Sequence, residues 1–331
     1  QSNNIVKSKK AFENYINNRK IINNVVDISS SYCFRQETFE NKIAIAYVLW
    51  NYPGISETFI VNELRWLVRN SYNVFLFYRE DIDKRSDLDF DIRSAKFDNV
   101  EDLADLIRKN SVDIMHSHFV YPIVTNYVWK AAEQTKTCFT FIAHAVDIFH
   151  YNNEKRNKID QISRSQYCVK VFAPGSFHKK YFIEHGVPKG KIVTTSQAVE
   201  FDFFNRVINN RDNKFRICSI ARFVEKKGLK YLIEAAKVIP DIQIDIYGYG
   251  ELYQAYSETI KEKDIKNVSF PGEINGKDKL FETLSMYDLF VLPCVRASNG
   301  DMDGIPTILM EAMAAGIPVL TTNISSIPDL V

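Results

Sequence analysis

The chain has 331 residues, 46% of them hydrophobic and 25% charged, which is typical of a globular protein with about two domains. Its net charge is +1, but residues 212–331 carry 13 Lys+Arg against 17 Asp+Glu, and the first 211 carry the other 29 and 24. No apolar run reaches the roughly 18 residues of a membrane span, and the polar start is unlike a signal peptide. The basic first part suits an anionic partner, such as a membrane surface or a phosphorylated acceptor, although an ordinary solvated surface explains it equally well.

The five cysteines are an odd number, and they are widely spaced without a Cys-x-x-Cys motif. Such spacing is unlike a disulfide framework or a zinc site. We therefore expect free buried thiols in a reducing compartment. The cysteines are Cys33, Cys138, Cys168, Cys218 and Cys294.

After an Asn- and Lys-rich extension (1–40), apolar strands alternate with amphipathic helices. The predicted strands of the first half are 42–49, 72–78, 112–118, 137–143, 167–173 and 191–196. The predicted helices there are 57–69, 121–134, 153–165 and 176–185. Such alternation predicts a parallel sheet covered by helices on both faces.

A polar break near 205–213 predicts a linker, after which the alternation restarts. The predicted strands of the second half are 215–221, 242–248, 267–270, 288–293 and a buried strand at 318–323. The predicted helices are 227–238, 250–263, 276–286 and about 304–315. We therefore divide the chain into the extension, an N-terminal domain (41–205) and a C-terminal domain (206–331), two doubly wound α/β units facing across a cleft.

The segment Asp303–Asn323 contains two acids, Asp303 and Glu311, around a Gly-Ile-Pro turn. Gly304 and Pro306 predict a helix start, because proline suits the first helical position. A helix start between two acids can hold a phosphate and its neighbouring hydroxyls. The alternative is a capped amphipathic helix without a ligand.

Three other segments follow predicted strands. Arg222 and Lys227, in ARFVEKKG, can neutralise a diphosphate, whereas the alternative is a solvated basic loop. Gly54 permits close backbone approach in the first loop, where an ordinary capped turn explains the sequence equally well. His144 ends a strand, a position where histidines are mostly structural. His116 and His118 end another strand, but no carboxylate spacing accompanies these three histidines, so no metal site is expected.

Together these segments resemble the family 4 (group 1) retaining glycosyltransferases of the GT-B fold, over residues 42–331. The resemblance is carried by SIARFVEKKGLKYLIEAAK and by DGIPTILMEAMAAGIPVLTTNISSIPDLV. YPGISETFIVNEL and AHAVDIF are similar to the branch that builds bacterial exopolysaccharide, including the colanic-acid type. No G-x-G-x-x-G follows the first strand of either half, which disfavours a dehydrogenase.

The resemblance implies transfer of a hexose from a nucleotide diphosphate sugar, UDP- or GDP-linked, with no cofactor or metal. Asp303 would hold hydroxyls of the donor sugar and Glu311 the ribose. Arg222 and Lys227 would neutralise the leaving diphosphate, and His144 would lie beside the donor sugar. The remaining matches are the helix start (Gly304, Ile305, Thr307), the first loop (Gly54) and the turn that contacts the base (Phe270 to Ile274).

The sequence departs from the family pattern at three places. Asp303 replaces a glutamate and Ala221 a glycine. Family members generally continue with further helices, so we expect an incomplete C-terminal domain.

The acceptor implied is a glycan or a polyprenyl-linked glycan at the cytoplasmic face of the membrane, with no nucleic acid as partner. Peripheral membrane contact by Trp66 with Arg65 and Arg69, and by residues 178–180, is one expectation; the alternative is that Trp66 packs in the core. A GT-B sugar-nucleotide 2-epimerase and a non-catalytic nucleotide-sugar-binding protein are alternative functions.

Overall fold

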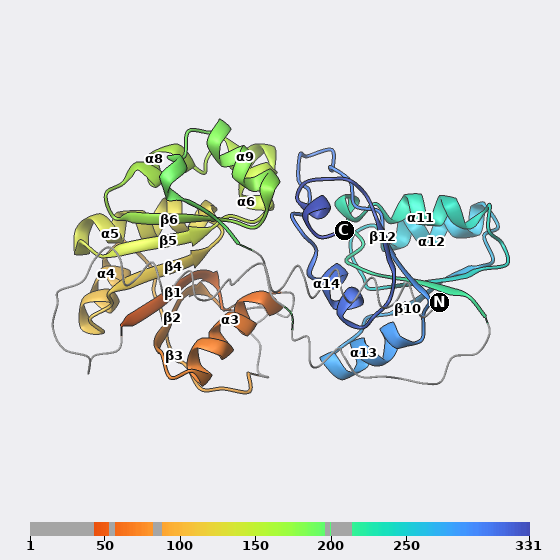
Figure 1. The fold of residues 1–331 in the computed structure, drawn as a ribbon, viewed down its shortest axis with the longest axis horizontal. Coiled ribbons are helices and arrows are strands. Elements are labelled where there is room, and N and C mark those ends of the chain that lie inside the picture. Colours follow the sequence, from red (N-terminus) through yellow and green to blue (C-terminus); the bar gives the residue numbers. More distant parts are fainter. Residues whose placement is uncertain (1–42, 53–56, 82–87, 196–198, 200–213) are drawn as a thin grey trace. The chain divides into compact units, whose positions relative to one another are not determined.

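A computed structural model describes residues 43–52, 57–81, 88–195, 199 and 214–331. The chain divides after Ala198 into two compact units. The extension at 1–40, Gly54 and the predicted boundary after residue 205 lie outside the described residues. Figure 1 shows that each unit has strands in a central layer with helices beside them.

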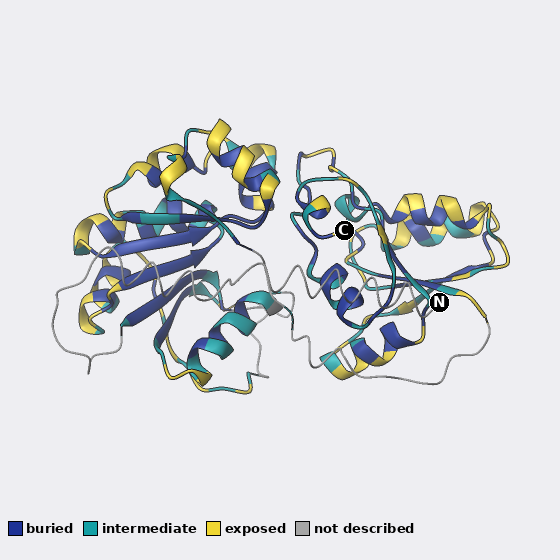
Figure 2. Ribbon diagram, in the orientation of Figure 1, coloured by how far each residue is buried: buried dark blue, intermediate teal, exposed yellow. Residues whose placement is uncertain are grey.

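The first unit contains a seven-stranded sheet in the order β3-β2-β1-β4-β5-β6-β7, with all neighbours parallel. Its central strands are fully buried or nearly so (Figure 2), because helices pack on both faces. The strands are β1 (Ala44–Asn51), β2 (Asn73–Glu80), β3 (Arg93–Lys96), β4 (Ile114–His118), β5 (Cys138–Ile142), β6 (Cys168–Ala173) and β7 (Ile192–Thr194).

Helical segments lie at the places predicted for this unit, but the predicted helix 153–165 is interrupted. It contains the end of one short helix (residues 151–154) and a second one (residues 159–164), because the backbone leaves the helical region at Lys158. The segments are α3 (Thr58–Arg69), α4 (Val100–Lys109), the π-helical η1 (Val120–Val128), α5 (Trp129–Thr135), α6 (Val146–Phe149), α7 (Tyr151–Glu154), α8 (Ile159–Arg164), α9 (Ser176–Glu184) and η2 (Lys189–Lys191).

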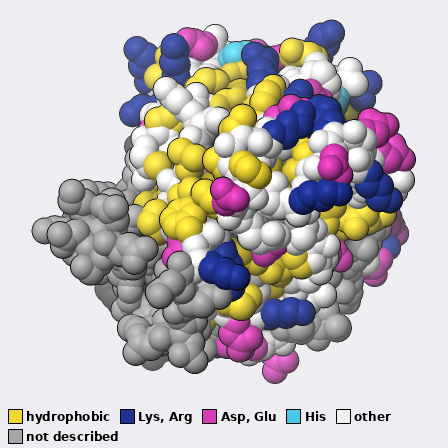
Figure 3. Space-filling model, turned by 90° about the vertical axis from the view of Figure 1, so that its right-hand side faces the viewer, with side chains coloured by type: hydrophobic (Ala, Val, Ile, Leu, Met, Phe, Trp, Pro, Cys, Tyr) yellow, Lys and Arg dark blue, Asp and Glu magenta, His cyan; other side chains and the backbone are white. Residues whose placement is uncertain are grey.

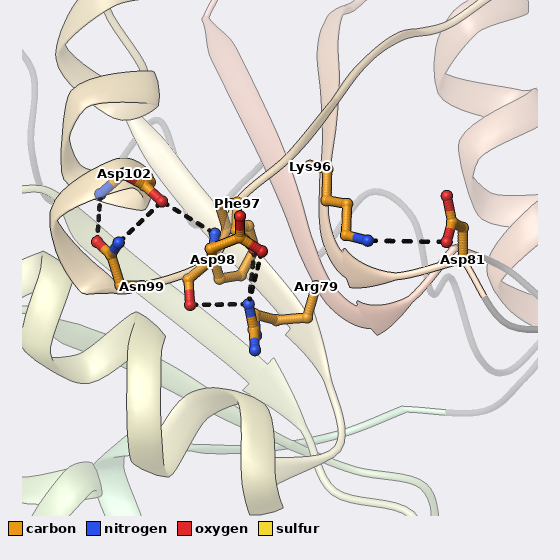
Figure 4. Close-up of polar contacts among 7 residues, drawn as sticks. All are labelled: Arg79, Asp81, Lys96, Phe97, Asp98, Asn99 and Asp102. Atoms are coloured by element: carbon orange, nitrogen blue, oxygen red, sulfur yellow. Dashed lines mark hydrogen bonds and ion pairs between the residues drawn. The ribbon is translucent and has the colours of Figure 1, made fainter.

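The sequence analysis missed β3 and α4, which polar contacts anchor to β2 (Figure 4). Arg79 Nη1 donates to the carbonyl oxygens of Phe97 and Asp98, at 3.0 and 2.7 Å. Asn99 caps α4 by accepting from the amide of Asp102 at 2.9 Å, and Asp102 accepts from the amide of Asp98 at 3.1 Å. The Asn-x-x-Asp spacing is a helix-start signal that the sequence does contain.

The second unit contains a five-stranded parallel sheet in the order β10-β9-β8-β11-β12. Its strands are β8 (Arg216–Ile220), β9 (Gln243–Tyr247), β10 (Val268–Gly272), β11 (Leu289–Leu292) and β12 (Val319–Thr321). Its helical segments are η3 (Glu225–Lys227), α11 (Leu229–Ala236), α12 (Tyr253–Glu262), α13 (Lys277–Ser285), α14 (Thr307–Ala314) and η4 (Ile327–Asp329).

Two predictions for this unit were wrong in detail. β12 is an edge strand and not a buried one, and Leu320 in it is 56% exposed, because only β11 pairs with it. Pro306 is the residue before α14 and not its first helical residue, since its ψ of 125° is extended. The helix begins at Thr307, one residue after Pro306.

The cysteines divide into two groups. Cys168, Cys218 and Cys294 are free and buried, as expected. Cys138 is disulfide-bonded, which corrects the expectation for that residue. Sequence spacing does not reveal which thiols the fold brings together. Among the described residues, no helix is both long enough and apolar enough to cross a bilayer.

Charges of both signs lie among apolar side chains on the face drawn in Figure 3. In the first unit, Arg65 and Arg69 both pair with Asp89, each at 2.7 Å. Trp66 packs against the core and stacks on Tyr72, with ring centroids 5.8 Å apart. The packing role of Trp66 is therefore confirmed, whereas membrane contact stays a prediction.

Gly228 lies between η3 and α11, where the loop after β8 packs against the loop after β11. Its φ is +64°, and an added Cβ would lie 1.9 Å from the carbonyl oxygen of Pro293. We expect Gly228→Ala to destabilise the second unit by more than the roughly 1–3 kcal/mol of a left-handed backbone alone, because it adds a backbone clash. Urea unfolding followed by circular dichroism measures this loss.

The matched control is Gly276→Ala, since Gly276 has a φ of +92° but open space around its Cβ position. All three tryptophans (Trp50, Trp66 and Trp129) lie in the first unit, so their fluorescence should not report the loss. Equal destabilisation by the two substitutions would contradict the packing argument.

Candidate functional site

The loops after β8 and β11 meet at the carboxyl end of the second sheet. The two strands are neighbours, but β8 connects to β9 on one side and β11 to β12 on the other. Ligands of doubly wound sheets bind in the crevice at this switch point. The loops contact each other directly, because the amide of Val295 donates to the carbonyl of Lys226 at 2.9 Å.

Two lysines and two aspartates form an ion-pair cluster between these loops. Lys227 Nζ lies 2.6 Å from Asp303 Oδ2, and Lys226 Nζ lies 2.9 Å from Asp301 Oδ2 and 3.5 Å from Asp303 Oδ1. All four side chains are only 11–13% exposed. Lys227, predicted to neutralise the diphosphate, and Asp303, predicted to hold the donor sugar, therefore form an ion pair with each other.

The cluster favours the charged forms of Asp303 and Lys226. Burial acts to raise the pKa of Asp303, but Lys227 and Lys226 outweigh it and the pKa is lowered. Burial acts to lower the pKa of Lys226, but Asp303 and Asp301 together raise it. Cys294 donates its thiol to Asp303 Oδ2 at 3.5 Å, and burial with the nearby carboxylate raises the pKa of that thiol to about 12.

One polar atom of the cluster is left unsatisfied. Asp301 Oδ1 is buried and has no hydrogen-bond partner among the residues that the structure describes. Such an orphaned acceptor is costly unless a ligand or water completes it. The cluster can therefore accept a further hydroxyl or amide donor.

Glu311 lies on α14, and its carboxyl is the second acid of the predicted pair. Burial raises its pKa to about 7, and the opposing influence of Lys277, the first residue of α13, is smaller. Glu311 is therefore poised to change charge near neutral pH. Thr307 is the first helical residue of α14, and Pro306 before it makes no side-chain hydrogen bond to the helix start.

The other predicted residues of this unit lie in the loops that follow β8, β10 and β11. Arg222 is exposed just after β8, and its charge acts on Lys226 without a direct bond among the described residues. Gly304 and buried Ile305 lead from Asp303 into α14. Ile274 is half-buried between β10 and α13.

His144, predicted from the first unit, follows β5 and is 9% exposed. Its ring Nε2 lies 2.9 Å from His118 Nδ1, and its amide donates to Asp147 Oδ1 at 3.0 Å. His178 Nε2 bonds to its carbonyl oxygen. His178 was grouped with exposed lysines at 178–180, but it is fully buried, because its ring serves this backbone contact.

A carboxylate that sequence reasoning missed lies beside these histidines. Glu63, from α3, lies 3.0 Å from His118 Nε2. The ligand atoms of Glu63, His116 and His118 lie within 4.8 Å of one another, a spacing that also suits a metal ion. The sequence spacing did not reveal this carboxylate, because the fold supplies it from 53 residues earlier in the chain than His116.

Three further participants were not singled out from the sequence: Lys226, Asp301 and His118 as a bonding partner of His144. The signals were weak but present, since Lys226 adjoins Lys227 and Asp301 stands two residues before Asp303. Local spacing could suggest these residues, but their partners depend on how the strands are ordered.

Comparison with known proteins follows the same division of the chain. The model of "Glycosyltransferase Family 4" matches residues 56–203, and that of "Glycosyl transferases group 1" matches residues 200–331. The amylovoran biosynthesis glycosyltransferase AmsK of Erwinia amylovora is 30% identical over 235 residues, which are 67% of this chain and 56% of AmsK. The putative colanic acid biosynthesis glycosyltransferase WcaL of Escherichia coli K12 is 36% identical over 152 residues, 44% of this chain and 37% of WcaL.

The chain thus spans little more than half the length of AmsK and less of WcaL. Among solved structures, Anabaena Alr3699/HepE in complex with UDP and glucose aligns with a TM-score of 0.70 at 15% identity, over 87% of this chain and 83% of that one. This likeness concerns the fold. Since two consecutive family models cover residues 56–331 and both units have the expected parallel sheets, the chain belongs to the group 1, family 4 glycosyltransferases of the GT-B fold.

Proposed function

We propose that this protein transfers a hexose from a nucleotide diphosphate sugar, with retention, to a glycan or lipid-linked acceptor in surface polysaccharide synthesis. The observation that carries the proposal is the buried cluster of Lys226, Lys227, Asp301 and Asp303 at the switch point of the second sheet. The roles named for AmsK and WcaL, amylovoran and colanic acid biosynthesis, support the polysaccharide context. HepE, whose structure contains UDP and glucose, supports a nucleotide-sugar donor.

The two lysines suit the step in which the glycosyl–phosphate bond breaks. Negative charge then develops on the diphosphate, and fixed positive groups aimed at it stabilise the transition state most. Lys226, Lys227 and Arg222 supply three cations near the end of β8. They can stabilise the leaving group without a metal ion, and the leaving phosphate can accept the proton of the acceptor hydroxyl.

The ion pairs suggest how the donor is admitted. In the structure Lys227 is held by Asp303, which keeps its buried charge neutralised. A diphosphate would take over Lys227, and Asp303 would then be released to accept hydroxyls of the sugar. Asp301 Oδ1, which has no hydrogen-bond partner in the described part of the chain, offers a second acceptor nearby.

A donor screen with UDP- and GDP-hexoses tests the proposal on this chain. Transfer to an added glycan or polyprenyl-linked acceptor supports it. Epimerised donor without an acceptor would indicate a 2-epimerase, and donor binding without turnover would indicate a non-catalytic protein. No binding of any nucleotide would contradict all three functions.

We predict that Lys227→Ala lowers kcat roughly 100- to 1000-fold, because one positive group aimed at the leaving diphosphate is lost. Steady-state kinetics with the identified donor measures the change. Lys230→Ala is the matched control, since Lys230 is an exposed lysine three residues along the chain, on α11. Equal activity of the two variants would rule out the role assigned to Lys227.

Nucleotide binding should depend on pH through Glu311. A carboxylate accepts both ribose hydroxyls, so the protonated form present below about pH 7 must lose its proton on binding. We expect affinity for the nucleoside diphosphate to rise as pH increases from 6 to 8, by up to about tenfold per unit below pH 7. Calorimetry at pH 6.5 in two buffers of different ionisation enthalpy should detect the released proton.

Glu311→Gln should bind more weakly and lose this proton release. A variant that keeps the release would show that another group titrates. Binding that is independent of pH in the parent protein would remove Glu311 from the ribose site.

The stability of the parent protein should fall as pH rises, whereas its nucleotide affinity should increase, and Glu311→Gln tests this. Because the folded pKa of about 7 lies above the ordinary value of 4.5, the stabilisation from protonation is present below about pH 4.5 and lost as pH rises through 7. Glu311→Gln is neutral throughout, so it should unfold at higher temperature than the parent at pH 8 and at a similar temperature at pH 5. Calorimetric melting at both pH values measures this, and a variant less stable at pH 8 would contradict it.

A further inference from the structure

The first unit contains a row of three titratable side chains that ends at His144. Glu63 comes from α3, His118 from the last position of β4, and His144 from the loop after β5. His118 and His144 are 1% and 9% exposed, and the Glu63 side chain is 19% exposed. β1, which leads into α3, and β4 are neighbours at the switch point of the first sheet.

The contact between the two histidines has the geometry of an in-plane hydrogen bond. His118 Nδ1 and His144 Nε2 are 2.9 Å apart, while the ring centroids are 5.1 Å apart and the rings are inclined by only 16°. Rings this far apart with nitrogens this close lie edge to edge and not face to face. One proton lies between the nitrogens, so the bond links the tautomer of one ring to that of the other.

Glu63 determines the other end of the row. Burial acts to raise its pKa, but the net shift is downward, with the hydrogen bonds from His118 and Tyr47 among its causes, so the carboxyl is ionised. Tyr47, whose pKa burial raises well above its usual value, donates its hydroxyl to Glu63 Oε2 at 3.2 Å. An ionised carboxylate can only accept, and therefore His118 Nε2 donates to it across 3.0 Å.

The rest of the surroundings hold His144 in one place. Asp147 Oδ1 accepts from the amides of His144 and Ala145, both at 3.0 Å, and His178 bonds to the His144 carbonyl. The His144 ring packs between Phe59 and Phe119, at centroid distances of 4.8 and 4.6 Å.

Phe119 has a φ of +70°, a strained value for a side chain of this size. Such strain persists only where surrounding contacts impose it, and it is concentrated at functional sites.

We propose that Glu63 and His118 are positioning residues that fix the tautomer and orientation of His144. Glu63 accepts from His118 Nε2–H, so His118 Nδ1 accepts from His144 Nε2–H. His144 is thereby held with its proton on Nε2, so that Nδ1 is the acceptor nitrogen of its ring. The use of this orientation in catalysis rests on the proposed function, but the tautomer itself does not.

A metal centre is the competing account of Glu63, His116 and His118. The hydrogen bonds favour the row of positioning residues, since both nitrogens of His118 and an oxygen of Glu63 are already used within it. His116 stands outside the row, because its Nδ1 bonds to Thr140 Oγ1 at 2.8 Å. Burial lowers the pKa of His116 to about 3, so it stays neutral.

The test is the ring ¹⁵N spectrum of histidine-labelled full-length chain at pH 7.5, which contains only six histidines. We expect both His118 and His144 to carry their proton on Nε2. Glu63→Gln, which keeps the shape and removes the charge, should shift both rings toward mixed tautomers. His118→Gln should shift the tautomer of His144. This variant is the alternative test if Glu63→Gln does not fold.

His116→Gln is the matched control, because His116 lies on the same strand but outside the row. It should leave the tautomers of His118 and His144 unchanged. A proton on His144 Nδ1 in the parent protein, or tautomers unaffected by Glu63→Gln, would overturn the proposal. One equivalent of zinc retained by the parent protein and lost in His116→Gln would also overturn it in favour of a metal centre.

Kinetics then separates positioning from the proposed function. With the identified donor, Glu63→Gln should lower kcat roughly 10- to 100-fold with little change in KM, because a misplaced group costs about this much. Nucleotide affinity should be unchanged. The predicted tautomers in a protein without transferase activity would refute the proposed function alone, and a fully active Glu63→Gln variant would refute the positioning role alone.

Discussion

Charged groups remain inside both units because each has an oppositely charged partner or a hydrogen-bond donor. In the second unit Lys226 and Lys227 are nearly buried, and Asp301 and Asp303 compensate them. In the first unit the ionised Glu63 is compensated by His118 and by the hydroxyl of Tyr47. A buried charge that loses its partner is strongly destabilising, so these pairs constrain every loop that carries them.

The geometry of the two parallel sheets explains where these polar groups lie. A parallel sheet brings the carboxyl ends of its strands to one edge, and the crevice opens where neighbouring strands lead in opposite directions. β1 and β4 form that point in the first sheet, and β8 and β11 form it in the second. Glu63 follows β1 and His118 ends β4 in the first sheet. Lys227 follows β8 and Asp303 follows β11 in the second. Each unit therefore places one of the two clusters at its own switch point.

The two clusters suit different tasks in the transfer that we propose. The lysine–aspartate cluster is highly charged, and in that proposal a diphosphate replaces Asp303 as the partner of Lys227. The histidine row is held by backbone and ring contacts on every side, which suits a group that must keep one orientation. Glu311 differs from both clusters, because burial raises its pKa to about 7 and its carboxyl can change charge near neutral pH.

The sequence alone determined the alternation of strands and helices, the two-unit organisation and the segments around Arg222, Lys227, His144, Asp303 and Glu311. Periodicity and turn chemistry are properties of neighbouring residues, so they can be recognised without a structure. β3 and α4 were missed because β3 is a short strand of four residues with polar ends, although Asn99 did signal the helix. Only the tertiary structure decided that β12 is an edge strand, that Lys227 bonds to Asp303, and that Glu63 reaches His118. Those facts depend on strand order and on contacts between residues 55 to 76 positions apart, which local patterns do not encode.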